Sequence, residues 1–362
     1  MDIKSLFKTV VEKDASELFL KVGYTPYLRL LGEITSIDTE KSLTSQDMEN
    51  IMKDLLSPEQ INIFRERKEV DFALDIPEIG RFRGILALDR EQPFFVFRNV
   101  KRKIPTFSEL GLPTKIMERL SMERRGLILL SGSTGSGKST TIASMIEYIN
   151  QHARKHILTI EDPIEFLFEN KKSIITQREI GSDCLSYMDA LRESTYQSPD
   201  VIFIGTIRDR ETMHAAIMAA ETGQLLLSTI HSINAPQTVE RIINLFPPHQ
   251  HDEIRMHLSL LLKGIISQRL VPRCDIPGRI PALEIMIGTP TISSLIRENK
   301  INQLYQYIEA GSFFGMQSFH QSLARLYFEK KISLDTAREF ADNPKELELF
   351  IQGIKKLDGT IE

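Results

Sequence analysis

One short run of the sequence limits what this chain can fold into more than any other: residues 132–139 read GSTGSGKS. The run matches GxxxxGK[ST], a loop whose backbone N–H groups surround phosphate oxygens and whose lysine reaches the terminal phosphates. Such a loop needs a buried strand before it and a helix after it. The aliphatic run 127–130 and the helically spaced apolar residues of 140–150 supply both. A chance glycine-rich turn would lack these flanks, so we predict a nucleotide-binding loop.

The residues of this loop have separate expected roles. Lys138 supplies positive charge to the β- and γ-phosphates, and the Ser139 hydroxyl is the predicted ligand of Mg²⁺. The predicted nucleotide-binding set is Ser133, Thr134, Gly135, Ser136, Gly137, Lys138, Ser139 and Thr140. ATP and Mg²⁺ are therefore the expected cofactors.

The pattern from residue 126 onward is typical of a parallel sheet covered by helices, because short aliphatic runs alternate with helical stretches. Polar residues follow four of these runs, namely 127–130, 157–160, 201–204 and 225–230. Ligands of such sheets bind beyond the carboxyl ends of the strands, so we predict one shared site there. Beyond residue 250 the pattern predicts mostly helix, including the apolar stretch 258–266.

The first hundred residues mix short β-like and helix-like runs, which predicts a small α+β domain over residues 1–100. Residues 101–114 concentrate charge, proline and glycine, and we expect them to connect the domains without forming a strand. A second domain over 115–362, with a helical C-terminal region, completes the predicted organisation.

Composition excludes several classes of protein. The net charge of −4 and the pI near 6.1 give no basic field for strong non-specific binding to nucleic acid. The two cysteines, Cys184 and Cys274, are far apart and lack the CxxC spacing of a zinc site. No apolar run reaches the ~18 residues that a membrane span needs. We therefore expect a cytoplasmic protein that meets a membrane only from outside the bilayer.

Two strand ends carry candidate catalytic residues. Glu161 follows the run 157–160, and a carboxylate there can orient the attacking water or hold Mg²⁺ through water. The neighbouring Asp162 has the alternative role of opening a turn before a proline. His231 follows the run 225–230, where it can sense the γ-phosphate or an adjacent subunit, or simply be a hydrogen-bonded histidine at a strand end.

Thr206 occupies a third strand end, after the run 201–204, where P-loop ATPases usually place an acid. A neutral hydroxyl can hydrogen-bond water but cannot accept its proton at pH 7. The sequence thus predicts a site that binds a nucleotide but lacks one usual general base.

Taken together, these motifs resemble one family, the secretion and type IV pilus ATPases, and within it the retraction branch called PilT/PilU. The resemblance covers nearly the whole chain, and the run 204–213 leans towards PilU. Extension ATPases usually carry a four-cysteine zinc insertion and a longer N-terminus, and we expect neither in this protein. The motifs that carry the resemblance are residues 15–19, 132–140, 160–165, 177–179, 208–209, 220–223, 241–243, 267–270, 288–298 and 315–319.

The resemblance implies an α/β fold in which a RecA-like P-loop ATPase domain is preceded by a small α+β PAS-like domain. It also implies a homohexamer that docks at the inner membrane through a pilus platform protein, with a second retraction ATPase as a further partner. The catalytic residues implied are Lys138, Glu161, Thr206, Arg208 and His231. In such rings, basic residues of the N-terminal domain approach the phosphates. The matching positions here are Arg81, Arg83 and Arg98. The alternative is that these arginines are solvated side chains on strand faces.

The chain departs from the family pattern at two positions. Thr206 stands in place of the usual glutamate, and Gln224 stands in place of a usual histidine. Two functions remain open at this point: a motor subunit for pilus retraction, and a hydrolysis-deficient nucleotide-binding subunit that depends on a partner ATPase. A nucleic-acid motor is disfavoured because the chain lacks a basic stretch with interleaved aromatic residues.

Overall fold

The computed structural model describes residues 2–30, 32–37, 41–100 and 103–354. The chain divides into two compact units, one made of residues 1–103 with 165–167 and the other of 104–164 with 168–362. Of the expected connector, residues 101 and 102 lie outside the described residues. Residues 103–113 contain no strand, and Phe107 and Leu112 are buried in the core of the second unit.

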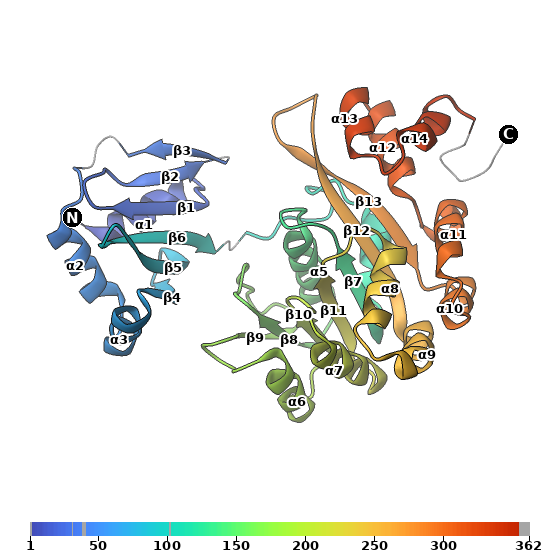
Figure 1. Ribbon diagram of the computed structural model, residues 1–362, viewed down its shortest axis with the longest axis horizontal. Helices are drawn as coiled ribbons and strands as arrows, with labels where there is room; N and C mark the ends of the chain where they lie inside the picture. The colour runs from blue at the N-terminus through green and yellow to red at the C-terminus, as the bar shows by residue number, and fades with distance from the viewer. Residues whose placement is uncertain (1, 31, 38–40, 101–102, 355–362) are drawn as a thin grey trace. The chain divides into compact units, whose positions relative to one another are not determined.

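The first unit is a six-stranded antiparallel sheet with the order β3-β2-β1-β6-β5-β4 (Figure 1). Helix α1 packs on the core through Ile3, Leu6, Phe7 and Val10, which share one face because they are three or four residues apart. The Phe7 ring lies 4.5 Å from the Phe82 ring. The elements are α1 (Ile3–Glu12), β1 (Glu17–Lys21), β2 (Tyr27–Leu30), β3 (Glu33–Ser36), α2 (Ser45–Leu55), α3 (Pro58–Arg67), β4 (Glu69–Ile76), β5 (Gly80–Asp89) and β6 (Gln92–Val100).

The second unit is built on a seven-stranded sheet with the order β13-β12-β7-β11-β10-β8-β9. Neighbouring strands from β12 to β9 are parallel, and β13 pairs antiparallel with β12. The strands are β7 (Gly126–Ser131), β8 (His156–Glu161), β9 (Ile174–Glu179), β10 (Val201–Ile204), β11 (Leu225–Ile230), β12 (Leu262–Pro272) and β13 (Arg279–Ile287). The parallel sheet and the antiparallel N-terminal domain confirm the predicted fold class.

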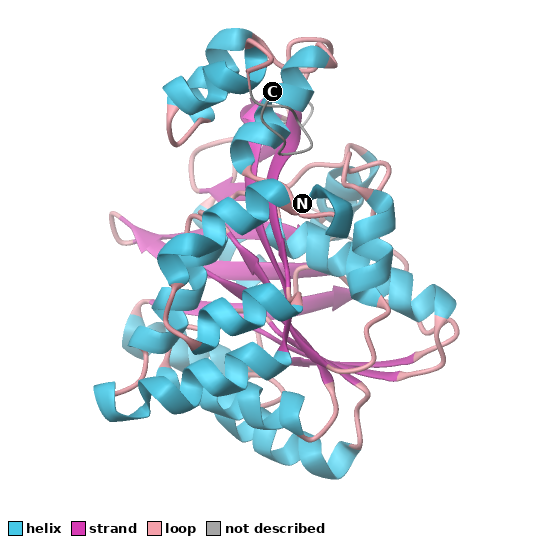
Figure 2. Cartoon of the chain, turned by 90° about the vertical axis from the view of Figure 1, so that its right-hand side faces the viewer, coloured by secondary structure: helices cyan, strands magenta, loops and turns pink. Residues whose placement is uncertain are grey.

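Helices cover both faces of this sheet (Figure 2). On β7, Leu127 and Leu129 face one helical layer while Ile128 and Leu130 face the other, and all four are fully buried. Complete burial of each such side chain stabilises the fold by about 2 kcal/mol. The helices are α4 (Thr114–Ser121), α5 (Lys138–His152), α6 (Tyr187–Gln197), α7 (Arg210–Glu221), α8 (Ala235–Asn244), α9 (His251–Leu261), α10 (Pro290–Arg297), α11 (Leu304–Ala310), α12 (Phe319–Phe328), α13 (Leu334–Phe340) and α14 (Pro344–Ile351), with 3₁₀ turns at Pro248–Gln250, Ile301–Gln303 and Ser312–Phe314.

The predicted helix over 258–266 is wrong, because α9 ends at Leu261 and strand β12 begins at Leu262. Residues of β12 pair with β7 on one side and β13 on the other, and Ile265 and Ile266 are fully buried. A strand buried on both faces shows no alternation of polar and apolar residues, so its sequence looks like that of a buried helix. The β12–β13 hairpin consequently widens the sheet beside the phosphate loop.

The last three helices, α12, α13 and α14, form a small cluster that we call the C-terminal module. They pack together around Phe319, Leu323, Ala337, Leu347 and Phe350, and against Val271, Ile280 and Ala282 of the hairpin. Within the residues that the structure describes, every helix is too short or too polar to cross a bilayer.

Candidate nucleotide-binding site

The loop of residues 132–137 connects the end of β7 to the start of α5, as predicted. The Lys138 ammonium is held inside this loop, where it donates to the carbonyl oxygens of Gly132 at 2.9 Å and Ser133 at 2.7 Å. Only 7% of Lys138 is exposed. Its charge therefore lies within the loop, and Ser139 follows it in the first turn of α5, whose N-terminus favours anions.

Strand β12 supports the loop from behind through Gln268. The Gln268 side chain is 3% exposed and accepts the Thr141 hydroxyl of α5 at 2.8 Å. One residue earlier, the Ser131 hydroxyl donates to the Ser267 hydroxyl at 2.8 Å. The run 267–270 was predicted to matter only through the family resemblance, since the preceding residues 258–266 were expected to form a helix.

Two glycines of the loop differ in the space around them. A Cβ on Gly132 would lie 2.4 Å from the Gln268 carbonyl oxygen, whereas a Cβ on Gly135 would meet nothing within 4 Å. Both residues have positive φ, so an alanine at either position carries a backbone penalty. We expect Gly132→Ala to lower the free energy of unfolding by about 2 kcal/mol more than Gly135→Ala does, because only the former overpacks the loop. Urea unfolding of the two variants measures this difference, and equal losses would contradict the close approach of β12.

Glu161, the predicted acid at the end of β8, is 6% exposed and held by two donors. The Thr159 hydroxyl donates to its Oε1 at 2.7 Å, and the Gln177 amide donates to the same oxygen at 3.3 Å. These bonds fix the orientation of the carboxylate, which is what a group that positions water requires.

Thr206 follows β10 and hydrogen-bonds through its hydroxyl to the Thr229 hydroxyl of β11 at 3.0 Å. The Thr229 hydroxyl already donates its one proton to the Gly205 carbonyl at 2.7 Å. Thr206 must therefore donate to Thr229, since each hydroxyl carries a single proton. The lone pairs of Thr206 remain able to accept a hydrogen bond from water, but this group cannot take up a proton at neutral pH.

His231 lies beside the phosphate loop. Burial, together with the positive charges of Lys138, Arg208 and Arg241, lowers the pKa of the His231 imidazole below its usual range, and a contact with the Gly132 backbone opposes this. The ring is therefore neutral at pH 7, with one nitrogen able to accept and the other to donate. The structure thus brings His231, Lys138 and Arg208 into one electrostatic neighbourhood.

Tyr187, the first residue of α6, was not singled out from the sequence but lies in the same neighbourhood. Burial raises the pKa of the Tyr187 hydroxyl, the charges of Asp162 and Glu161 raise it further, and Arg208 opposes them. Arg208 therefore lies near enough to influence both the Tyr187 hydroxyl and the His231 imidazole. Four of the five predicted catalytic residues lie at or just after the ends of the adjacent strands β8, β10 and β11, and the fifth, Lys138, begins α5 after the loop.

Arg81, Arg83 and Arg98 lie on β5 and β6 of the first unit. Each is paired with a carboxylate there: Arg81 with Asp75 at 3.0 Å, Arg83 with Asp71, and Arg98 with Glu17 at 3.0 Å. Arg83 and Arg98 are direct cross-strand partners, so these acids also offset a like-charge contact. The part of the three arginines in nucleotide binding stays a prediction.

The donor set fits a nucleotide accompanied by Mg²⁺. The loop offers an ammonium, backbone N–H groups at a helix start and the Ser139 hydroxyl, while Mg²⁺ usually takes few protein ligands and completes its shell with phosphate and water. The described residues hold no cluster of three or more acidic, histidine or cysteine side chains suited to a metal ion. An open pocket of about 460 Å³ lies against loop residues 132–136 and is also lined by residues 268–270 of β12, by Arg279 and by residues 339–342.

Known proteins resemble this chain over most of its length. Residues 95–311 match the family described as type II/IV secretion system protein. The chain is 39% identical over 352 residues to the type IV pilus ATPase PilU of Pseudomonas aeruginosa, covering 97% of this chain and 92% of that protein. It is equally 39% identical over 345 residues to the retraction ATPase PilT of the same organism, covering 95% and 99%.

Solved structures give the same result. The crystal structure of the pilus retraction motor PilT with bound ADP superposes with a TM-score of 0.89 at 42% identity, covering 96% of this chain and 99% of that one. The Legionella pneumophila ATPase DotB shares the fold, with a TM-score of 0.77 at 21% identity and coverage of 93% and 94%.

Fold and site together define a nucleotide-binding ATPase of the P-loop class. The chain belongs to the PilT/PilU family of type IV pilus ATPases, as the sequence motifs predicted. Equal identity to PilT and PilU does not separate the two, so the leaning of residues 204–213 towards PilU stays a prediction.

Proposed function

We propose that this chain is the ATP-binding subunit of a ring-shaped homohexamer that powers retraction of a type IV pilus and hence twitching motility. The observation that carries the proposal is the phosphate loop with Lys138 held inside it, in a chain that matches a retraction ATPase over nearly its full length. A twitching motility protein of Neisseria gonorrhoeae, 39% identical over 345 residues, supports it further. The ring acts in the cytoplasm, at the inner membrane, on a platform protein of the pilus.

In this proposal the nucleotide phosphates lie in the loop and the nucleoside lies in the adjoining pocket. Residues 133–140 bind the phosphates, Lys138 neutralises their charge, and the Ser139 hydroxyl holds Mg²⁺. The bound Mg²⁺ supplies further neutralisation of phosphate oxygens. The volume of about 460 Å³ lies in the usual range for small-molecule sites. Arg81, Arg83 and Arg98 provide additional cations to the phosphates.

Catalysis in this site falls to groups at the strand ends. Glu161, oriented by Thr159 and Gln177, positions the attacking water. Arg208 stabilises charge on the transferred phosphoryl group, because a planar guanidinium suits phosphate oxygens. The neutral His231 responds to the γ-phosphate by hydrogen bonding.

One observation favours a second function. The Thr206 hydroxyl donates its hydrogen bond to Thr229 and cannot take up a proton at neutral pH, so the site has no general base at that strand end. A subunit of this kind binds ATP and moves within, or beside, a ring whose turnover a partner retraction ATPase supplies.

Steady-state phosphate release by the purified full chain with Mg²⁺ and ATP tests the proposal and separates the two functions. An autonomous motor turns over at about 1 s⁻¹ or faster, within the range common to ATP-dependent enzymes. An accessory subunit binds ATP without such turnover until the partner ATPase is added. A protein that binds no ATP at all would contradict both proposed functions.

A further inference from the structure

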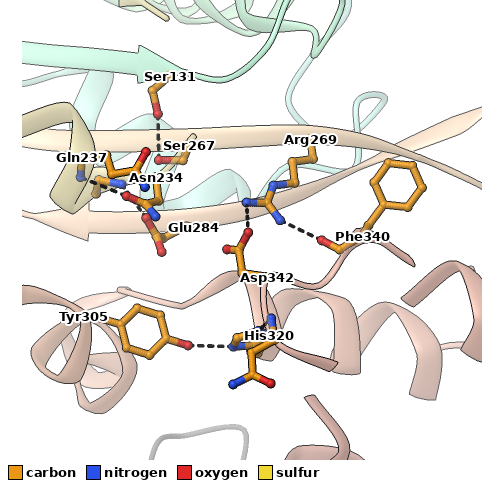
Figure 3. Close-up of polar contacts among 12 residues, drawn as sticks. Ser131, Asn234, Gln237, Ser267, Arg269, Glu284, Tyr305, His320, Phe340 and Asp342 are labelled. Atoms are coloured by element: carbon orange, nitrogen blue, oxygen red, sulfur yellow. Dashed lines mark hydrogen bonds and ion pairs between the residues drawn. The ribbon is translucent and has the colours of Figure 1, made fainter. Parts of the chain in front are cut away.

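Glu284 is a carboxyl group buried inside the second unit, and none of the motifs above includes it. It lies on β13, is 1% exposed and accepts the backbone N–H of Ala235 at 2.6 Å. Ala235 is the first residue of α8, so the carboxylate takes one of the N–H groups that a helix leaves unpaired at its start. Asn234 caps the same helix by accepting the N–H of Gln237 at 2.9 Å, and Figure 3 shows Asn234 and Gln237 beside Glu284.

A second set of contacts ties Glu284 to the phosphate loop. Ser267 of β12 is its direct cross-strand partner, and the Ser267 hydroxyl helps to lower the pKa of the Glu284 carboxyl. Ser267 in turn accepts the Ser131 hydroxyl at 2.8 Å (Figure 3). Ser131 is the last residue of β7, immediately before the loop. Because Ser131 donates to Ser267, the Ser267 proton is free to point at Glu284, a direction that suits an ionised carboxylate.

These contacts connect the two segments that carry the phosphate loop and His231. Ser131 precedes the loop by one residue, and Ala235 follows His231 by four. Glu284 accepts from the start of α8 and lies opposite Ser267, which in turn accepts from the end of β7. A shift of the α8 start relative to β7 would therefore have to break a bond to this carboxylate.

We propose that Glu284 is a positioning residue for ATP hydrolysis, which fixes the start of α8 to the base of the phosphate loop and so holds His231 beside Lys138. The proposal rests on the function proposed above. Glu284 acts through the backbone of the 231–235 segment and does not itself contact the nucleotide.

The charge state of Glu284 changes close to neutral pH. Burial raises the pKa of its carboxyl to about 7, and the negative charge of Asp342 in the C-terminal module adds to this effect. The Ala235 N–H, Arg269 and Ser267 lower it. The charge of Glu284 also reaches Tyr305 of α11, where it adds to the burial that raises the pKa of the Tyr305 hydroxyl.

The direction of the pH effect follows from linkage. The Ala235 N–H favours the ionised carboxylate, so ionisation must strengthen the bond to Ala235 by the same free energy. A bond to a charged acceptor is roughly twice as strong as one to a neutral acceptor. The start of α8 is therefore held firmly above about pH 7 and loosens as Glu284 takes up a proton below it.

Amide hydrogen exchange of the Ala235 N–H, the group that donates to Glu284, tests this when it is read as a protection factor in the full-length protein from pH 6 to pH 8.5. In the wild type we expect protection to rise about five- to tenfold over this range. In Glu284→Gln the protection is low and independent of pH, while strands β8 and β10 keep theirs. Glu240→Gln, which removes an exposed carboxylate from the same helix, behaves as the wild type.

Three results would overturn the proposal: no pH dependence in the wild type, protection that falls as pH rises, or a loss in Glu284→Gln that spreads equally over the sheet. If Glu284→Gln does not fold, Ser267→Ala replaces it, with an expected pH midpoint above that of the wild type. Where the chain hydrolyses ATP, Glu284→Gln lowers kcat with little change in KM. Failure of the protein to bind ATP would refute the proposed function. The exchange profile tests the link between Glu284 and α8 independently of ATP binding.

Discussion

Lys138→Ala is expected to weaken ATP binding by about 10²-fold or more, the largest loss that any single substitution in this chain should cause. The Lys138 ammonium is almost fully buried and lies inside the phosphate loop, bonded to two of its carbonyl oxygens. Removing one partner of a buried, hydrogen-bonded charge pair costs about 2–5 kcal/mol, and Lys138→Ala would leave the phosphates without their partner. Every 1.4 kcal/mol is tenfold in affinity.

Titration of the purified protein with a fluorescent ATP analogue and Mg²⁺ measures this loss. The matched control is Lys155→Ala, because Lys155 is a half-buried lysine that immediately precedes β8, at the amino end of the strand and away from the loop. Lys155→Ala should bind the analogue within about twofold of the wild type, since it removes no contact to phosphate. Comparable affinity of Lys138→Ala and the wild type would show that the loop does not bind the nucleotide.

The phosphate loop could be predicted because its chemistry is local. Backbone wrapping of phosphate, the lysine and the hydroxyl all fall within eight residues, and the flanking strand and helix have clear patterns of their own. The strand ends at Glu161, Thr206 and His231 were equally predictable, since parallel strands place their carboxyl ends at one edge.

The support behind the loop was not predictable, because it depends on pairing between distant segments. Gln268 and Ser267 reach the loop only because β12 pairs with β7, and that strand was mistaken for a helix. Glu284 meets the start of α8 across 49 residues of sequence. One signal did exist: Glu284 is the single acid in the otherwise apolar run 280–287, where a buried charge needs partners.

Thr206→Glu is expected to raise the rate of phosphate release by about 10²–10⁴, if the missing base is what limits turnover. That factor corresponds to about 3–5 kcal/mol of activation free energy. Position 206 is half-buried, next to Gly205, on which a Cβ would lie 3.5 Å from the Glu161 backbone. A second carboxylate there would lie near Glu161, and two such neighbours raise the pKa of one another towards the range in which a base is effective.

Thr206→Gln is the matched control, because glutamine has the length of glutamate but cannot accept a proton. Both variants lose the hydrogen bond from Thr206 to Thr229, so any difference between their rates measures the base alone. If Thr206→Glu is no faster than Thr206→Gln, and the wild type already turns over quickly, then Glu161 activates the water in this site. In that case Glu161→Gln abolishes phosphate release. The subunit is then a motor whose general base lies at the end of β8, in place of the usual acid after β10.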